Sequence, residues 1–411
     1  MNEERFEENT EKGRLVDQLG WNVSGLLDNV STNDMQDMCL TRTQYLEKCL
    51  GFRRSPIFLP VCVTFLVIFV VGVFGNALTC IVIVRFKVMR TPTNYYLFSL
   101  AVSDLLVLLL GMPLELYEMW SNYPFLFGTG GCYFKTLLFE TVCFASILNV
   151  TALSVERYIA VVHPLKVRHV ATRAHAKHVI LMVWVVSVAC AVPNTSLHGV
   201  DMLEPRFGVR FPESAICTIV KPRWIYCLII QVTTLAFFFL PMLTITAMYM
   251  RIGQKLSEGR GQRGAGPGRG FGPDSHCSVH RQQQTARHFQ VTKMLCVLVI
   301  VFGICWAPFH IDRLMWSFIN NDNHHLIFEY VHIVSGVFFY LSSAVNPILY
   351  NLMSTRFREM FTKITCRCAL FGGHVHRLTL RSTQMTLRTS LYEKPQRNMT
   401  LERISQDRDS P

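Results

Sequence analysis

Charged side chains are scarce in this chain of 411 residues, because Lys, Arg, Asp and Glu together make up only 17% of it. A soluble domain typically has about 25%, and half of this sequence is hydrophobic. The length alone would permit two or three soluble domains, but the composition argues against them.

Instead of soluble domains, the sequence contains seven long apolar stretches. A helix needs about 20 apolar residues to cross about 30 Å of hydrocarbon. The sequence therefore predicts an all-α membrane protein, a seven-transmembrane helix bundle. The expected spans are residues 57–84, 94–118, 131–155, 177–193, 225–249, 291–317 and 326–350.

Lysine and arginine are absent from residues 118–131 and 317–325, whereas the loops at the other ends of the spans contain residues such as Arg85, Arg168 and Arg251. Basic loops stay on the cytoplasmic side of a membrane. We therefore expect an extracellular N-terminus, a cytoplasmic C-terminus and a plasma-membrane location. The net charge of +12 is spread over loops and tail, which fits this orientation better than nucleic-acid binding.

Signs of catalysis and of metal or nucleotide binding are also missing. His324 and His325 form the only metal-like pair, and no further ligands stand at zinc spacing. The pattern Gly259-x-Gly261-x-x-Gly264 follows an apolar span rather than a strand, so it does not predict a phosphate loop. The sequence shows no internal repeat and no inverted halves, the features that would indicate a transporter. We expect neither an enzyme nor a metal site.

Three short motifs mark the spans. Glu156-Arg157-Tyr158 closes the third, Cys305-Trp306-Ala307-Pro308 lies in the sixth, and Asn346-Pro347-Ile348-Leu349-Tyr350 ends the seventh. Together they resemble the rhodopsin-like G-protein-coupled receptors. The resemblance implies that Glu156 holds Arg157 at rest, and that Arg157 contacts the G protein once the sixth helix swings outward. The alternative is an ordinary arginine reaching the membrane surface.

Proline supplies the bend that such a movement needs. Pro308 removes one helical hydrogen bond and bends the sixth span, so a small shift of Trp306 becomes a larger displacement at the cytoplasmic end. Pro347 and Tyr350 are expected to act similarly in the seventh span.

Asp104 is the deepest acid, and an ionisable group in hydrocarbon persists mainly where it faces the bundle interior. With Asn76, Ser146 and Asn346 it resembles the allosteric sodium site of these receptors. In the alternative, Asp104 is hydrogen-bonded to its neighbours without an ion. No other cofactor is expected.

The outer half of the bundle is expected to bind the ligand. Glu115 lies three helical turns beyond Asp104 on nearly the same face, and Glu140 lies in the third span. Two inward acids with one inward arginine suit a peptide with positive and electron-rich groups, and we expect Glu115 and Glu140 to receive an arginine of the peptide. The alternative is that one acid neutralises Arg313 internally. The expected ligand-binding residues are Glu115, Glu140, Phe309, His310 and Arg313.

Two other ligand classes fit poorly. An amine receptor would carry an aspartate one turn deeper than Glu140, where this chain has Cys143 and Phe144. An opsin would need a lysine in residues 326–350, which contain none.

Longer runs narrow the resemblance. Residues 91–100, 115–128, 193–199 and 305–313 resemble the neuromedin U receptors, and Val161-Val162-His163-Pro164-Leu165 favours the type 1 members. The similarity covers about residues 55–365. It implies an amidated, arginine-containing peptide agonist such as neuromedin U or neuromedin S. Coupling would be mainly to Gq/11 with calcium release and Gi as a second candidate, with arrestin and receptor kinases as further partners. The alternative is a related receptor of the ghrelin, motilin or neurotensin group.

The same resemblance pairs Cys132 with Cys217 in the receptor family's disulfide. Cys366 and Cys368 follow a short amphipathic segment, the expected eighth helix, and are candidates for palmitoylation. Asn22 and Asn29 begin glycosylation motifs, and whether Cys39 pairs with Cys49 is open. The expected domains are an outer tail at 1–55, the bundle at 56–352 with a flexible glycine-rich loop at about 255–288, and a helix with a cytoplasmic tail at 353–411.

Overall fold

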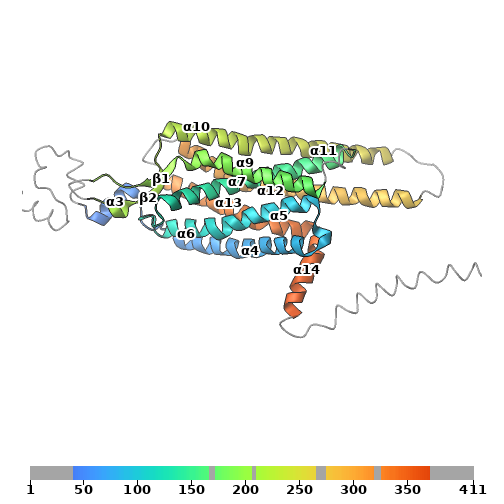
Figure 1. Ribbon diagram of the computed structural model, residues 1–411, viewed down its shortest axis with the longest axis horizontal. Helices are drawn as coiled ribbons and strands as arrows, with labels where there is room; N and C mark the ends of the chain where they lie inside the picture. Colours follow the sequence, from blue (N-terminus) through green and yellow to red (C-terminus); the bar gives the residue numbers. More distant parts are fainter. Residues whose placement is uncertain (1–39, 166–171, 206–209, 265–274, 319–324, 371–411) are drawn as a thin grey trace, which may run out of the picture. The chain divides into compact units, whose positions relative to one another are not determined.

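The computed structural model of the chain describes residues 40–165, 172–205, 210–264, 275–318 and 325–370. These residues include seven helices that are long and apolar enough to cross a membrane. Figure 1 shows the seven spans running side by side. The predicted seven-helix fold is therefore confirmed.

Five of the spans are single helices, and two are interrupted. The single ones are α4 (Phe58–Arg85), α7 (Gly128–Val162), α9 (Arg173–Thr195), α12 (Ser275–Phe318) and α13 (His325–Met353). The second span consists of α5 (Pro92–Leu106), the π-helix η2 (Val107–Gly111) and α6 (Met112–Trp120). The fifth consists of α10 (Arg223–Thr234), the π-helix η4 (Leu235–Phe239) and α11 (Leu240–Gly264).

Shorter elements occupy the loops. They are α3 (Arg42–Leu50), the 3-10 helices η1 (Lys87–Met89) and η3 (Pro212–Ser214), and the strands β1 (His198–Asp201) and β2 (Ile216–Ile219). The two strands pair antiparallel, with Val200 opposite Cys217. Figure 1 shows α3 and this hairpin at the same end of the bundle.

Local sequence signals set the ends of several spans. The Thr91 hydroxyl accepts from the backbone N–H of Asn94, and Pro92 takes the first helical position of α5. Proline is favoured there because that N–H has no helical partner. The Thr172 side chain caps α9 in the same way.

Two boundaries differ from the sequence prediction. Glu156-Arg157-Tyr158 does not close the third helix, because α7 continues to Val162. The loop expected at 255–288 is also shorter, since α11 reaches Gly264 and α12 begins at Ser275. Residues 281–287 are Arg, Gln, Thr and Ala, mostly good helix formers, so the helix extends beyond its apolar part. Residues 265–274 lie outside the described residues.

A separate unit follows the bundle and contains α14 (Thr355–Leu370). This helix occupies the segment where an eighth helix was expected. The side chains of Cys366 and Cys368 are outside the described residues, as are Cys39, Asn22 and Asn29. Palmitoylation and glycosylation therefore stay predictions.

Glycine lets α4 and α13 approach closely. A Cβ atom at Gly75 would lie 2.7 Å from Cγ of Pro347, and a proline ring cannot move aside. Next to this contact, Asn76 Nδ2 donates to the backbone oxygen of Ser343 at 2.8 Å. The small residue thus brings the two helices within reach of a buried hydrogen bond.

We predict that Gly75→Ala destabilises the protein by about 1–3 kcal/mol, the usual cost of overpacking a rigid contact. The measurement is the thermal unfolding temperature of the purified protein. Gly253→Ala is the control, because a Cβ there meets nothing within 4 Å. Equal unfolding temperatures for the two variants would mean that α4 and α13 do not meet at Gly75.

Candidate functional site

A cavity of about 380 Å³ opens among the outer ends of the spans and the β1–β2 hairpin. Apart from His198, its walls contain seven residues with acidic or basic side chains: Glu115, Glu118, Lys135, Glu140, Asp312, Arg313 and His332. Four of the expected ligand-binding residues, Glu115, Glu140, Phe309 and Arg313, therefore line one cavity.

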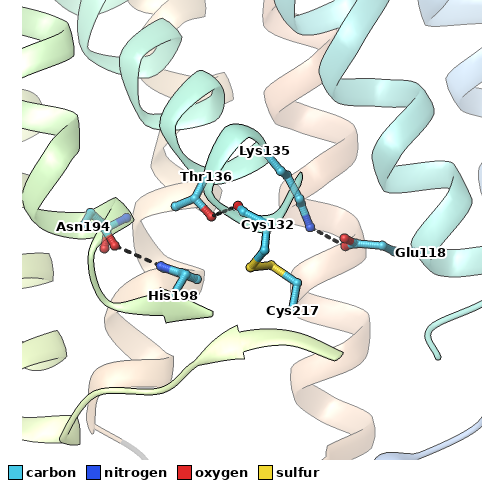
Figure 2. Close-up of a disulfide and its surroundings, with 7 residues drawn as sticks. All are labelled: Glu118, Cys132, Lys135, Thr136, Asn194, His198 and Cys217. Atoms are coloured by element: carbon cyan, nitrogen blue, oxygen red, sulfur yellow. Dashed lines mark hydrogen bonds and ion pairs between the residues drawn. A yellow bond between two sulfur atoms is a disulfide. The ribbon is translucent and has the colours of Figure 1, made fainter. Parts of the chain in front are cut away.

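The disulfide Cys132–Cys217 fixes one wall of this cavity, which confirms the predicted pairing. It joins the first turn of α7 to β2, as Figure 2 shows. Cys217, Thr218 and Ile219 of the strand face the cavity. The hairpin is thus held across the mouth of the bundle.

His198 of β1 lines the wall beside the disulfide. Its Nδ1 lies 2.9 Å from the backbone oxygen of Asn194 (Figure 2). Burial lowers the pKa of His198 below its ordinary 6.5, so the ring is neutral at pH 7. Since the carbonyl can only accept, Nδ1 carries the proton and Nε2 is left as an acceptor.

Glu140 and Arg313 form a buried ion pair. Arg313 Nη1 lies 2.7 Å from Glu140 Oε1, and the two side chains are only 12% and 5% exposed, respectively. In this structure Glu140 therefore neutralises Arg313 internally, as the alternative expected. Glu140 is not a free acid. The reason is spatial, because α7 and α12 bring the two charges together in a medium where neither could stay unpaired.

His332 connects two more acids. Its Nδ1 lies 2.9 Å from Asp312 Oδ2, and its Nε2 lies 3.4 Å from Glu115 Oε1. Nearby, Lys135 and Glu118 form a third ion pair, seen on the right of Figure 2. Glu115 and Glu118 are 22% and 24% exposed, against 5% for Glu140 and 6% for Asp312. The two acids of α6 are therefore the ones that a ligand reaches first.

The cavity has an excess of negative charge. Four carboxylates stand against Lys135 and Arg313, a net charge of −2 with His332 neutral and −1 with it protonated. Such a mouth attracts cations and raises their local concentration.

Acceptor oxygens in the cavity wall also lack donors. Within the described part of the chain, the buried atoms without a hydrogen-bond partner include Glu118 Oε1, Glu140 Oε2, Asn194 Oδ1 and Asp312 Oδ1. All four residues line the cavity. An unmet buried acceptor costs about 1–3 kcal/mol, so a ligand that brings N–H groups into the cavity removes this cost.

Aromatic rings form the inner end of the cavity. Phe309 and Phe339 lie in its wall, and Trp306 packs below them with ring centroids 5.9 and 5.3 Å away. Phe302 stacks on Trp306 in turn, at 4.8 Å. A ligand that pushes on Phe309 or Phe339 therefore pushes on Trp306.

His310 does not line the cavity, contrary to the sequence prediction. Its ring stacks on Phe238 at 4.4 Å, and its Nδ1 lies 3.4 Å from Thr234 Oγ1. Phe309 and Arg313, three and seven residues beyond Trp306, lie on the same helix face as Trp306. His310, four residues beyond, turns toward the fifth span. His310 is thus not part of the cavity wall, and its contact with a ligand stays a prediction.

Glu115 reaches the cavity along a path that the sequence did not show. The π-helix η2 interrupts the span between Asp104 and Glu115. A π turn holds about one residue more than an α turn, which rotates every later residue by roughly 100°. The position predicted for Glu115 is right, but the three regular turns behind the prediction do not exist.

The four residues of the expected sodium site are each buried. Asn346 Nδ2 donates to Asp104 Oδ2 at 2.9 Å. Ser146 Oγ lies 3.2 Å from Ser103 Oγ, and Asn76 Oδ1 has no partner among the described residues. A buried carboxylate and an unpaired buried amide oxygen are both ligands of the kind that a hard cation prefers.

Toward the C-terminal end of α7, Arg157 Nη2 lies 3.8 Å from Glu156 Oε1. The same oxygen accepts from Thr93 Oγ1 at 3.3 Å. Pro308 lies inside α12 and Pro347 inside α13, and Tyr350 is buried. Tyr158 packs edge-on against His163 at 5.6 Å. In this structure the Arg157 guanidinium thus lies within ion-pair distance of the Glu156 carboxylate.

Sequence reasoning missed Glu118, Lys135, Asp312 and His332. Each is an ionisable residue within a long apolar helix, which is a functional signal in its own right. Counting such residues would have found them, but not their pairing.

The rim of the cavity is joined to the outer tail. Tyr45 and Leu46 of α3 form an apolar cluster with Tyr123 and Phe211. Arg42 donates to both carboxylate oxygens of Glu213, and its guanidinium holds the pKa of Glu213 below its ordinary 4.5. The tail helix is therefore fastened to the loop that carries β2.

We predict that this attachment weakens only in acid. A lowered folded pKa means that the pair stabilises α3 above about pH 4.5 and is lost as pH falls through the folded value. Hydrogen-exchange protection of α3, corrected for intrinsic rates, should be constant from pH 7 to 5 and fall below that. Glu213→Gln should lose protection between pH 7 and 5, where the native pair is intact, whereas the exposed Glu204→Gln in the same loop should not. Unchanged protection in Glu213→Gln would contradict the attachment.

Comparison with known proteins adds an independent line of evidence. Residues 75–350 match the 7 transmembrane receptor (rhodopsin family). The chain is 54% identical over 366 residues to neuromedin-U receptor 1 of Homo sapiens, covering 86% of this chain and 83% of that protein. It is 51% identical over 350 residues to neuromedin-U receptor 2 of Rattus norvegicus, covering 84% and 86%. Identity to growth hormone secretagogue receptor type 1 of Mus musculus is 38% over 333 residues, covering 77% and 84%.

Proposed function

The chain belongs to the rhodopsin family of seven-transmembrane receptors, in the group of the neuromedin U receptors, and from this membership we propose that its ligand is an amidated peptide of the neuromedin U or neuromedin S type. It is a neuropeptide receptor and not an enzyme, and it is a multi-pass membrane protein. The distribution of lysine and arginine supports a plasma-membrane orientation with the N-terminus outside.

One observation carries the ligand proposal. The outer cavity combines a net negative charge with four buried acceptors that lack donors. A peptide with an arginine and a carboxamide end supplies positive charge and N–H donors together. The carboxylates of an acidic ligand would face these unpaired acceptors with further acceptors, and no hydrogen bond could form.

The peptide arginine fits best at Glu115 and Glu118. They are the more exposed acids, and a guanidinium pairs with carboxylates through two parallel hydrogen bonds. Glu140 is already paired with Arg313, so it acts on the ligand through its second oxygen and through the position of Arg313.

We predict that Glu115→Gln lowers peptide affinity by roughly 10- to 150-fold, the equivalent of a charged hydrogen bond of about 1.5–3 kcal/mol. Replacing the peptide arginine by citrulline should lower affinity on the native receptor and much less on Glu115→Gln. The measurement is competition binding in a double-mutant cycle.

Glu140→Gln is the matched comparison for this cycle. We expect its loss and the citrulline loss to be additive, because Glu140 pairs with Arg313. Additive losses at Glu115, with coupling at Glu140, would place the peptide arginine at Glu140 instead.

We place G-protein contact at Arg157, released when the cytoplasmic part of α12 moves outward about Pro308. The packing of Phe309 and Phe339 on Trp306 supports this route. We propose Gq/11 with calcium release as the main pathway and Gi as a second. Receptor kinases would phosphorylate the tail, and arrestin would bind the phosphorylated tail.

Arg157→Ala should separate binding from signalling, because Arg157 lies at the opposite end of α7 from Cys132. Agonist affinity should persist while calcium release collapses at matched surface expression. Full calcium efficacy in this variant would show that Arg157 does not contact the G protein.

We also propose that a sodium ion is held by Asp104 and Asn76, with Ser146 and Asn346 completing the site. The cation would offset the buried carboxylate charge. The donor set supports this proposal, since Asp104 is buried and Asn76 Oδ1 lacks a partner in the described part of the chain.

The direct test of the ligand class is calcium release from transfected cells. Neuromedin U and neuromedin S should activate, whereas ghrelin, motilin and neurotensin should not. This chain is less identical to growth hormone secretagogue receptor type 1 than to neuromedin-U receptor 1, which supports the expectation that the first set of peptides activates. A response only to a peptide of the second set would overturn the proposal.

A further inference from the structure

His332 of α13 stands beside Glu115, where the positive charge of the ligand is proposed to bind. Its Nε2 lies 3.4 Å from Glu115 Oε1, and its Nδ1 lies 2.9 Å from Asp312 Oδ2. The side chain is 57% exposed, so the ring is open to the solvent of the cavity and can exchange a proton with it. One residue thus touches the acid and reaches water.

The two contacts of this ring need two N–H groups. A neutral imidazole has one N–H and one lone pair. If Nδ1 donated to Asp312 in the neutral ring, Nε2 would turn its lone pair toward the Glu115 carboxylate, and two acceptors repel. The doubly protonated ring instead presents an N–H to each acid. The contacts of His332 are therefore those of an imidazolium, which serves as the receptor's own cation on Glu115.

Charged groups from three other helices surround this ring. They are Glu115 and Glu118 of α6, Lys135 and Glu140 of α7, and Asp312 and Arg313 of α12. Lys135 is paired with Glu118 and Arg313 with Glu140, and these two cations keep their charge to about pH 10 or beyond. A histidine loses its charge much nearer neutral pH. Among the acids of α6, Glu115 is therefore the one whose resident cation can be removed by the loss of a proton.

We propose that His332 competes with the peptide for Glu115: the positive group of the peptide takes the place of the imidazolium, and the ring releases one proton to the solvent. The Nε2–H bond breaks, and the neutral ring still donates through Nδ1 to Asp312. The freed Nε2 lone pair then accepts an N–H of the peptide guanidinium. This inference rests on the peptide ligand proposed above, and it places the arginine at Glu115 rather than at Glu118.

Peptide affinity then depends on pH. Because the proton and the peptide compete, affinity rises with pH over the range in which the free receptor holds the proton and the complex does not. For one proton the change is at most about tenfold per pH unit. A fall in extracellular pH should therefore weaken binding while the ion pairs of Lys135 and Arg313 stay charged.

The test is isothermal titration calorimetry of the full-length receptor in phosphatidylcholine nanodiscs with neuromedin U at pH 7, repeated in buffers of different ionisation enthalpy. The slope of the measured enthalpy against the ionisation enthalpy of the buffer counts the protons exchanged. The native receptor should release about one proton per bound peptide. His332→Gln keeps an N–H donor but no titratable ring, so it should release almost none. The peptide with citrulline in place of its arginine should release almost none from the native receptor, because it brings no charge to Glu115.

The matched control is His198→Gln, which changes the other histidine of the cavity wall. The ring of His198 is already neutral at pH 7, so this variant should release as many protons as the native receptor. Binding heat that does not depend on the buffer, or a proton release that survives His332→Gln, would overturn the proposal while leaving the ligand in place. The absence of any binding heat would contradict the proposed ligand and this inference together, so the two failures are distinguishable.

Discussion

A charge inside an apolar helix bundle must find a partner, and this constraint governs the interior of the receptor. Arg313 meets Glu140 across α12 and α7, and Asp104 meets Asn346 across the second and seventh spans. Glu156 meets Arg157 and Thr93 at the far end. Each pairing joins different spans or fixes a residue at a helix end. The polar groups thus determine which helices are tied together, while close contacts such as Gly75 against Pro347 determine how near they come.

The outer cavity is where pairing is left incomplete. Its acids exceed its bases, and four oxygens have no donor among the described residues. The disulfide keeps the hairpin over the mouth, so these groups are held in place before a ligand arrives. Preorganised acceptors gain most from a ligand that brings both charge and N–H groups, because less ordering is needed on binding. The aromatic rings of Phe309 and Phe339 beneath pack on Trp306, two residues before Pro308, and this is the route that we propose from the cavity to the rest of α12.

Sequence reasoning reached the seven spans through apolar length, the disulfide through the family resemblance, and the cavity positions of Phe309 and Arg313 through helical spacing from Trp306. It failed where the outcome depends on three dimensions. The π-helix η2 rotates Glu115, and no residue pattern in 107–111 announces it. His310 was assigned by stripe, but a shift of one residue turns it to Phe238. The choice of Glu140 as the partner of Arg313, and of His332 as the bridge between Asp312 and Glu115, depends on how three helices meet.

The most direct measurement is a high-resolution structure of the receptor with neuromedin U bound. We expect the peptide arginine within hydrogen-bonding distance, about 3 Å, of Glu115 or Glu118. We also expect peptide N–H groups on the oxygens of Glu140, Asn194 and Asp312 that now lack donors. A peptide whose arginine stays outside the cavity, with those oxygens still unpaired or facing a peptide carboxylate, would contradict the view that incomplete pairing selects the ligand.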